Sequence, residues 1–297
     1  MRLIHAVLLA ALSATPALAQ TEHRQLPRAD GSVIDYALYV PDGVAEGLLL
    51  FAQGSGCAPT ATNANLAVAR AAFPQHVVLA VEKRGVVPDA AIADGYSDCP
   101  AAFTAGYTVS GRVADYEAVL AALGSPLPLV LYGGSEGGLA VAMLSATVAA
   151  DAAILVSSAT GVPFAEMVLS TVPPEGQASV RAAFDAARAD PRGTAIFAGS
   201  SHRFWADILD RVAADDMLAS DTPFLLIQGG RDSASPVAAG RATVDRFAAA
   251  GRCNVNSWEF PALDHGMVDP TGRSHMAAIV AAAAQWATTA RQLAPRC

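Results

Sequence analysis

The stretch that most constrains the fold of this chain extends from Leu129 to Gly138, with the sequence Leu-Val-Leu-Tyr-Gly-Gly-Ser-Glu-Gly-Gly. An apolar, strand-like run leads into a glycine-rich turn that carries Ser135, and an apolar helical run follows. The turn fits the pattern G-x-S-x-G, in which a serine sits on a strained corner with its hydroxyl exposed above a sheet. Glycines are needed because backbone segments meet closely there, and a Cβ at Gly133 or Gly137 would strike its neighbours. The competing interpretation is an ordinary glycine turn with a chance serine.

Apolar runs typical of buried strands alternate with helical patterns along most of the chain. The predicted strands cover residues 32–40, 47–53, 76–81, 127–132, 152–157, 224–228 and 255–260, with 24–27 as a hairpin partner of the first. The predicted helices cover residues 63–73, 113–123, 139–148, 236–250 and 274–293. This alternation predicts a mainly parallel sheet with helices on both faces.

Two segments depart from this alternation. Residues 86–110 are expected to be irregular, and from Thr160 to Asp221 only helical patches are visible, at 178–189 and 204–214. The second segment is therefore predicted to be an insertion into a single domain, with two small domains as the alternative.

The first 19 residues are typical of a signal peptide. Arg2 begins a short basic start, an apolar core too short to span a bilayer follows, and the segment ends in an Ala-x-Ala pattern at Ala19. We therefore expect residues 1–19 to be removed and residues 20–297 to be exported, to the periplasm or the medium, without a membrane span. A retained membrane anchor is the alternative.

The charge balance excludes some partners. Removal of residues 1–19 takes away one arginine and no acid, which changes the formal net charge from −8 to −9. The chain has a single lysine, Lys83. A net-acidic chain of this kind argues against binding to nucleic acid or to an anionic membrane.

The four cysteines suggest disulfide bonds. Cys57, Cys99, Cys253 and Cys297 are an even number in a chain expected to be exported, which allows two disulfides in any of three pairings. Free thiols are the alternative. Their wide spacing is not that of a zinc site, so we expect no bound metal.

A serine hydroxyl is a weak nucleophile that needs a base, and the base needs an orienting acid. Around such a serine turn the partners follow in the order serine, acid, histidine. Asp232 lies just after the predicted strand 224–228, and His265 lies just after the predicted strand 255–260. Because the carboxyl ends of parallel strands meet at one edge of a sheet, Ser135, Asp232 and His265 are the predicted catalytic residues.

Other residues compete for two of these roles. Asp232 could only cap the helix that follows, which would leave the orienting role to Asp264 or Asp221. His275, in the last helix, and His202, in the insertion, are the alternatives for the base.

A tetrahedral intermediate also needs an oxyanion hole of two backbone N–H groups. One comes from the residue after the nucleophile, Glu136, at the positive N-terminal end of the following helix. The second comes from the glycine-rich loop after the predicted strand 47–53, where Ser55 is the expected donor. A plain glycine-rich turn is the alternative for this loop.

Together these residues resemble the α/β-hydrolase superfamily. Gly133–Gly137, Asp232 and His265 match its triad motifs. Gln53-Gly54-Ser55 resembles its His-Gly-x oxyanion loop, with Gln in place of His, and Glu82-Lys-Arg-Gly85 stands where many members carry an Arg-Gly turn. The resemblance covers nearly all of residues 20–297.

The resemblance implies a mostly parallel, eight-stranded α/β sheet with helices on both faces and a helical cap at residues 160–221. It also implies the pairs Cys57–Cys99, since the loops after the third and fourth strands would be neighbours, and Cys253–Cys297, which would join the last strand to the last helix.

The expected reaction is hydrolysis of a carboxylic ester through an acyl-enzyme, without a metal or cofactor. Seven apolar residues of the insertion could line an acyl pocket or could simply form core: Phe164, Met167, Leu169, Phe184, Phe197, Phe204 and Trp205. A peptidase acting on short peptides is the second hypothesis, with Glu166 or Glu175 binding a free amino terminus. A binding protein that has lost catalysis is the third.

Overall fold

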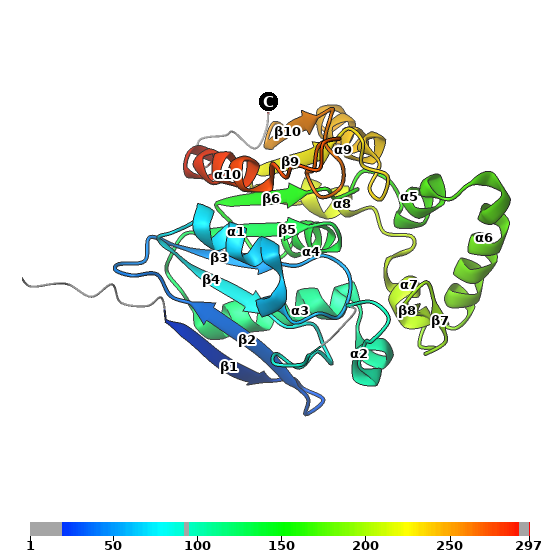
Figure 1. The fold of residues 1–297 in the computed structure, drawn as a ribbon, viewed down its shortest axis with the longest axis horizontal. Coiled ribbons are helices and arrows are strands. Elements are labelled where there is room, and N and C mark those ends of the chain that lie inside the picture. The colour runs from blue at the N-terminus through cyan, green and yellow to red at the C-terminus, as the bar shows by residue number, and fades with distance from the viewer. Residues whose placement is uncertain (1–19, 92–94, 291–296) are drawn as a thin grey trace, which may run out of the picture.

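An eight-stranded sheet forms the centre of the computed structural model, which describes residues 20–91, 95–290 and 297. The strand order is β1-β2-β4-β3-β5-β6-β9-β10 (Figure 1). The strands are β1 (Thr21–Pro27), β2 (Val33–Tyr39), β3 (Gly47–Ala52), β4 (His76–Val81), β5 (Leu129–Gly134), β6 (Ala152–Val156), β9 (Phe224–Gly229) and β10 (Val255–Phe260). Strand β2 pairs antiparallel with β1 and β4, and all pairs from β4 to β10 are parallel. The predicted mainly parallel sheet is confirmed.

Helices cover both faces of this sheet. Helices α1 (Ala64–Ala72) and α10 (Met276–Ala290) pack on one face, where Leu66 and Ile279 join the same buried cluster. Helices α3 (Val109–Leu123), α4 (Glu136–Leu144) and α9 (Val237–Ala249) pack on the other face. The predicted helices correspond to these five. The end of the last one, and the predicted signal peptide at residues 1–19, lie outside the described residues.

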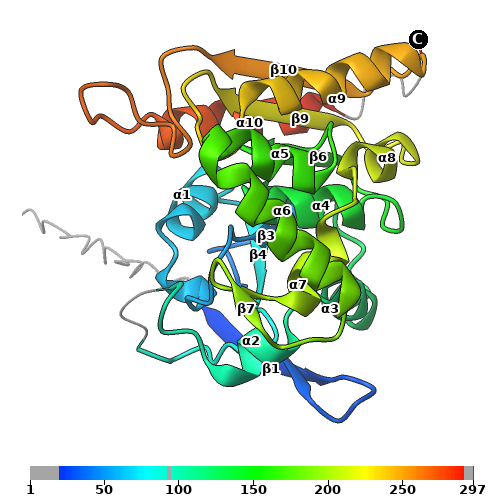
Figure 2. The same ribbon diagram turned by 90° about the vertical axis from the view of Figure 1, so that its right-hand side faces the viewer.

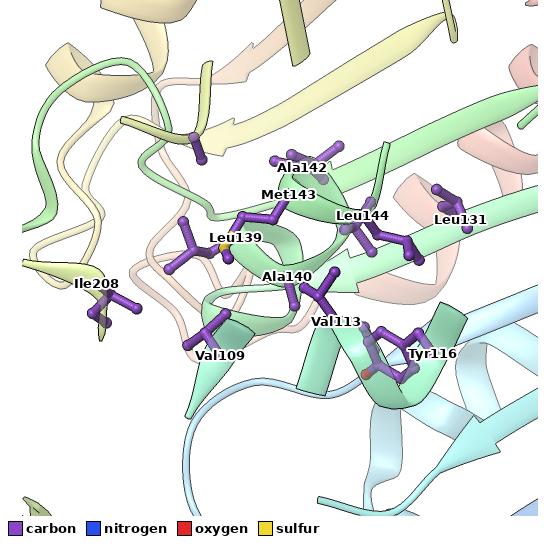
Figure 3. Close-up of a cluster of buried hydrophobic side chains, with 14 of the residues drawn as sticks. Val109, Val113, Tyr116, Leu131, Leu139, Ala140, Ala142, Met143, Leu144 and Ile208 are labelled. Carbon is purple, nitrogen blue, oxygen red and sulfur yellow. The ribbon is translucent and has the colours of Figure 1, made fainter. Parts of the chain in front are cut away.

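Helix α4 is buried along its whole length, which explains its nearly continuous apolar sequence. It packs against α3 through Leu139, Leu144 and Val113, and Ile208 reaches the same cluster from the segment after β6 (Figure 3). The helix begins at Glu136, directly after Ser135, and not at Leu139 as predicted. Two glycines of low helix propensity hide the first turn in the sequence, whereas burial in the tertiary structure stabilises it.

The segment between β6 and β9 departs from the sheet. It comprises α5 (Phe164–Thr171), α6 (Pro174–Ala189), the small hairpin β7 (Ile196–Phe197) and β8 (Ser200–Ser201), α7 (His202–Ile208) and α8 (Ala213–Leu218). Helices α5, α6 and α7 lie beyond the carboxyl ends of the central strands, at the right of Figure 1, and face the viewer in Figure 2. The single helix predicted at 204–214 is two helices, with a break between Ile208 and Ala213.

Residues 86–110 are not wholly irregular, contrary to the prediction. They contain α2 (Ala101–Gly106) and the start of α3. Phe103 of α2 stacks on Tyr107 with ring centroids 4.7 Å apart, and Thr108 caps α3 by accepting a hydrogen bond from Gly111 N. A six-residue helix depends on such tertiary contacts, because its own sequence is too short to hold a helix.

Each cysteine is paired. Cys57 and Cys99 form one disulfide, with Cα atoms 5.5 Å apart, and Cys253 and Cys297 form the other, at 5.2 Å. These are the two pairs that the resemblance implied. Among the described helices, none is long and apolar enough to cross a bilayer.

Candidate active site

Ser135 occupies a strained turn between β5 and α4. Its backbone angles are φ 53° and ψ −124°, a combination that residues with a side chain rarely adopt. Two hydrogen bonds hold the turn: Ser135 N donates to Val156 O at 2.8 Å, and Ser158 Oγ donates to Ser135 O at 2.9 Å. The end of β6 and the residues just after it therefore fix the backbone conformation of Ser135.

The glycines beside Ser135 are required by close packing. A Cβ at Gly133 would lie 2.3 Å from Gly137 O, and a Cβ at Gly137 would lie 2.0 Å from Ala52 O. Neither distance is tolerable, since all of these neighbours are backbone atoms. The close approach of α4 to the end of β3 thus depends on glycine, as the sequence pattern predicts.

Asp232 and His265 form a hydrogen-bonded pair. His265 Nδ1 lies 2.9 Å from Asp232 Oδ2 and 3.0 Å from Oδ1, and the Asp232 side chain is fully buried. Asp232 Oδ1 also accepts from the N–H groups of Ala234 and Ser235. The carboxylate therefore orders the turn before α9, as the capping alternative proposed, and faces the histidine as well. With Nδ1 committed to Asp232, the Nε2 of His265 is left as the basic nitrogen.

Ser135 and His265 line one cleft of about 270 Å³ at the carboxyl edge of the sheet, together with Ser55. Ser157 Oγ donates to His265 O at 2.8 Å and so fixes the loop that carries the histidine. Among the described residues, the hydrogen bonds of the His265 ring go to Asp232 and none goes to Ser135. Catalytic serine–histidine contacts often tighten only when substrate is bound.

The alternative residues have other partners. His275 Nε2 lies 2.8 Å from Asp269 Oδ2, and His275 is not among the residues that line the cleft. Asp264 accepts hydrogen bonds from backbone N–H groups of its own turn, and Asp221 pairs with Arg252 at the surface. His202 Nδ1 lies 3.8 Å from Asp190 Oδ2, and His202 is not among the residues that line the cleft. The geometry therefore favours Asp232 and His265.

The two expected oxyanion donors both lie near Ser135: Glu136 follows it directly, and Ser55 lines the same cleft. Within the described residues, neither the Ser55 nor the Glu136 N–H donates a hydrogen bond to the protein. The loop after β3 lies close to the serine, since a Cβ on Gly54 would be 3.5 Å from Ser135 Cβ. The side chain of Gln53, at the position of the histidine in the motif that the loop resembles, holds this loop by donating a hydrogen bond to Ala58 O at 3.0 Å.

A buried cluster of charges lies next to the glycine-rich turn that carries Ser135, here called the elbow, and sequence reasoning missed it. Glu136 Oε1 accepts hydrogen bonds from Lys83 Nζ at 2.9 Å, from Tyr107 Oη, and from Arg112 Nη1 at 3.4 Å. Burial is the largest single effect and would raise the pKa of Glu136, but the charges of Lys83 and Arg112, together with the hydrogen bonds from Lys83 and Tyr107, lower it. The role assigned to Glu136 from the sequence concerned its N–H alone. The signal available was that the chain's one lysine follows a buried strand.

The segment Glu82–Gly85 joins several elements at this point. Glu82 accepts hydrogen bonds from the N–H and hydroxyl of Thr60, while Arg84 forms an ion pair with Asp30. Gly85 has φ 80°, and a Cβ there would lie 2.3 Å from Phe103 N. The Glu82–Gly85 turn thus contacts the segment after β3, the β1–β2 turn and α2.

A second cavity, here called the aromatic pocket, opens beside the cleft and has a volume of about 200 Å³. Ser55 and Tyr96 line both. The aromatic residues of its wall are Tyr96, Phe103, Tyr107, Phe164, Phe204 and Trp205. Of the seven apolar residues considered from the sequence, Phe164, Phe204 and Trp205 line it, and Phe184 is core.

The polar groups of this wall are largely engaged. Trp205 Nε1 donates to Phe197 O at 2.9 Å, and the Tyr107 hydroxyl is bound by Glu136. The pocket therefore presents ring surfaces to whatever occupies it.

No protein-family model and no curated protein sequence matches this chain. Solved structures do. A puromycin-hydrolyzing peptidase from Mycobacterium tuberculosis is 15% identical, with a TM-score of 0.63 over 95% of this chain and 40% of its own. This chain therefore spans less than half of that peptidase. Est1E from Butyrivibrio proteoclasticus is 13% identical, with a TM-score of 0.59 over 90% of this chain and 98% of its own. The esterase RhEst1 from Rhodococcus sp. ECU1013 is 21% identical, with a TM-score of 0.54 over 90% and 98%.

These similarities identify the architecture. The chain has the α/β-hydrolase fold, as the sequence motifs predicted. At such low identity the neighbours indicate the fold, and function has to be argued from the site.

Proposed function

We propose that this protein is an exported serine hydrolase that cleaves carboxylic esters through an acyl-enzyme on Ser135. One observation carries the proposal: a strained serine and a histidine oriented by a buried carboxylate line the same cleft. The two disulfides fit an exported chain. The proposal includes a signal peptide at residues 1–19 and a single domain at 20–297 with a cap at 160–221.

The reaction proceeds in two steps. His265 Nε2 removes the hydroxyl proton as Ser135 Oγ attacks the ester carbonyl carbon, and Asp232 stabilises the imidazolium that forms. The N–H groups of Ser55 and Glu136 bind the oxyanion of the tetrahedral intermediate. The intermediate collapses, the alkoxide leaves with the proton from His265, and the acyl group remains on Ser135. Water, activated by the same histidine, attacks the acyl carbon and releases the acid.

The aromatic pocket supports an ester with an apolar, ring-bearing group. It adjoins the cleft through Ser55, one of the two proposed oxyanion donors, so a group attached to the reacting carbonyl can enter it. Its volume of about 200 Å³ suits a phenyl or phenylpropanoid group. Flat rings would stack on its aromatic walls.

The peptidase hypothesis has less support. An aminopeptidase needs a carboxylate to bind the substrate's ammonium group. Glu166 lies in a separate surface depression with Arg181 and Arg188, and neither Glu166 nor Glu175 is among the described residues that line the cleft. The acidic residue of the aromatic pocket, Glu136, is already paired with Lys83. One structural neighbour is a puromycin-hydrolyzing peptidase, so amide substrates belong in the test.

The test compares p-nitrophenyl esters of acetate, butyrate, benzoate and phenylpropionate with aminoacyl and prolyl amides. We expect ester turnover, with Ser135→Ala folded but slower by several orders of magnitude, and labelling of Ser135 by a fluorophosphonate. Amide turnover above ester turnover would favour the peptidase. No turnover and no labelling would favour a binding protein.

A second comparison tests the pocket. Phe204→Ala should raise KM for the phenylpropionate ester several-fold and leave the acetate ester nearly unchanged. Trp258→Ala, at a surface that does not border the cleft, is the matched control. If Phe204→Ala changes KM equally for both esters, the aromatic pocket does not bind the aromatic group of the substrate.

A further inference from the structure

Lys83 is buried between the two halves of the proposed oxyanion hole. It is 1% exposed and follows the end of β4. Its ammonium group donates three hydrogen bonds: to Gly54 O at 2.7 Å, to Gly56 O at 2.9 Å and to Glu136 Oε1 at 2.9 Å. One side chain therefore binds both the loop after β3 and the residue after the nucleophile, and it has no proton left for another acceptor.

The bond to Gly54 O fixes the direction of the Ser55 N–H. Gly54 C=O and Ser55 N–H belong to one peptide unit, and the described chain has no cis peptide bond. In a trans peptide these two groups point in opposite directions. Because Gly54 O is drawn toward Lys83 in the core, the Ser55 N–H is directed away from the core, and Ser55 lines the cleft.

The bond to Gly56 O holds the other end of the same loop. Cys57 N donates to Gly95 O at 2.7 Å, so both polar groups of the Gly56–Cys57 peptide, the carbonyl and the N–H, are held by hydrogen bonds. Two glycines leave this loop free to adopt other backbone conformations, and a side chain at Gly56 is excluded by its φ of 92°. The hydrogen bonds from Lys83 to Gly54 O and Gly56 O therefore help to fix where the N–H groups of the loop point, in addition to the bond from Gln53 to Ala58 O.

We propose that Lys83 is a positioning residue that sets the oxyanion hole, by orienting the Gly54–Ser55 peptide and tying it to Glu136. It does not touch the substrate and acts through the Ser55 N–H. The inference rests on the proposed function, since an oxyanion hole has a role only if Ser135 attacks a carbonyl.

The surroundings of Lys83 make its protonation state part of this role. The ammonium group is surrounded by Glu136 of α4, Arg112 of α3, the neighbouring Glu82 after β4, and the face of Tyr107, whose ring centroid is 4.9 Å from Nζ. Burial lowers the pKa of Lys83 to about 8, with Glu136 opposing the shift. A neutral amine has only two N–H groups for three acceptors, so one of the three bonds is lost when it deprotonates.

The decisive experiment compares Lys83→Met with Arg112→Met. Both remove a buried cation bound to Glu136, but within the part of the chain that the structure describes Arg112 donates its other hydrogen bond to Tyr116 and none to the loop after β3. In Lys83→Met we expect kcat to fall about 100-fold with KM within about threefold, and a trifluoromethyl ketone inhibitor to weaken in proportion to kcat. Arg112→Met should lose thermal stability and keep kcat within about fivefold of wild type.

Two outcomes of that comparison overturn the proposal: a Lys83→Met kcat within fivefold of wild type, or an equal loss in Arg112→Met, which would point to the charge cluster and not the loop. A crystal structure of Lys83→Met with the Gly54 carbonyl unmoved also overturns it. If wild-type Ser135 does not react with a fluorophosphonate, the proposed function fails. If it reacts equally fast in both Lys83→Met and wild type, only this inference fails.

The wild-type protein provides a test that does not depend on folding of a variant. Because Lys83 is the chain's one lysine, labelling with ¹³C-lysine yields a single Cε resonance to titrate. We expect kcat to decline at the pH at which that resonance titrates, because the neutral amine loses one of its three hydrogen bonds. A kcat that stays constant through the titration overturns it.

Discussion

The sharpest test of the elbow is the substitution Gly137→Ala. The added methyl group would lie 2.0 Å from Ala52 O and 2.6 Å from Gln53 O, both backbone atoms at the end of β3. Real Cβ contacts are essentially never shorter than 3.0 Å, so α4 and the end of β3 must separate by about 1 Å. That movement separates the Glu136 N–H from the Ser55 N–H, and a misplacement of about 1 Å can cost roughly 100-fold in rate.

The magnitude for stability follows from overpacking in a rigid core. Forcing a methyl group into such a site costs about 1–3 kcal/mol, which for a domain of this size lowers Tm by roughly 4–8 °C at 2 kcal/mol. The control is Gly134→Ala in the same turn, where the nearest atom to the added methyl group is Val156 O at 3.9 Å. Its unfolding free energy should change by less than about 1 kcal/mol.

The assay combines thermal unfolding by circular dichroism with kcat on a p-nitrophenyl ester. We expect Gly137→Ala to lose about 100-fold in kcat while remaining folded at 25 °C. If Gly137→Ala matches Gly134→Ala in both Tm and kcat, the close approach of α4 to β3 does not position the site, and the steric argument is wrong.

Three further predictions concern the same region. Asp232→Asn should lower kcat roughly 10³–10⁴-fold with little change in Tm, because the amide favours the wrong tautomer of His265; an unchanged kcat in steady-state assays would remove Asp232 from the triad. Replacing Cys57 and Cys99 by serine should lower the unfolding free energy in urea by about 4 kcal/mol and also lower kcat, since Cys57 adjoins the oxyanion loop. The matching replacement at Cys253 and Cys297 should lower stability alone, and equal losses of kcat would contradict this. Burial lowers the pKa of Lys83 from 10.5 to about 8. Between these two pH values the unfolded chain therefore holds a proton that the folded chain has released. The free energy of unfolding of the wild-type protein should rise with pH in this range, relative to that of Lys83→Met.

The fold was predictable because burial leaves a strong pattern in the sequence. Strands β3, β5 and β9 are covered on both faces, so their sequences are continuous apolar runs. The turn at Ser135 can be recognised from its glycines, which are required because a Cβ would clash with neighbouring backbone atoms. Helix α2 was missed because its stability comes from contacts such as Phe103 on Tyr107, which lie outside local periodicity.

The candidate residues Ser135, Asp232 and His265 could be named from the sequence because each follows its own strand, and parallel strands end at one edge. The glycine corner and the four cysteines could also be read directly from the sequence. The pairing of the cysteines followed from the sequence only through the resemblance to α/β hydrolases, whereas the aromatic pocket and the three hydrogen bonds of Lys83 arise only when distant segments pack together. Lys83 and Glu136 are 53 residues apart in the sequence, and the residues around each of them do not predict that the two form an ion pair. Only the parallel pairing of β3 with both β4 and β5 brings the ends of these strands together, and with them the lysine, the oxyanion loop and the elbow.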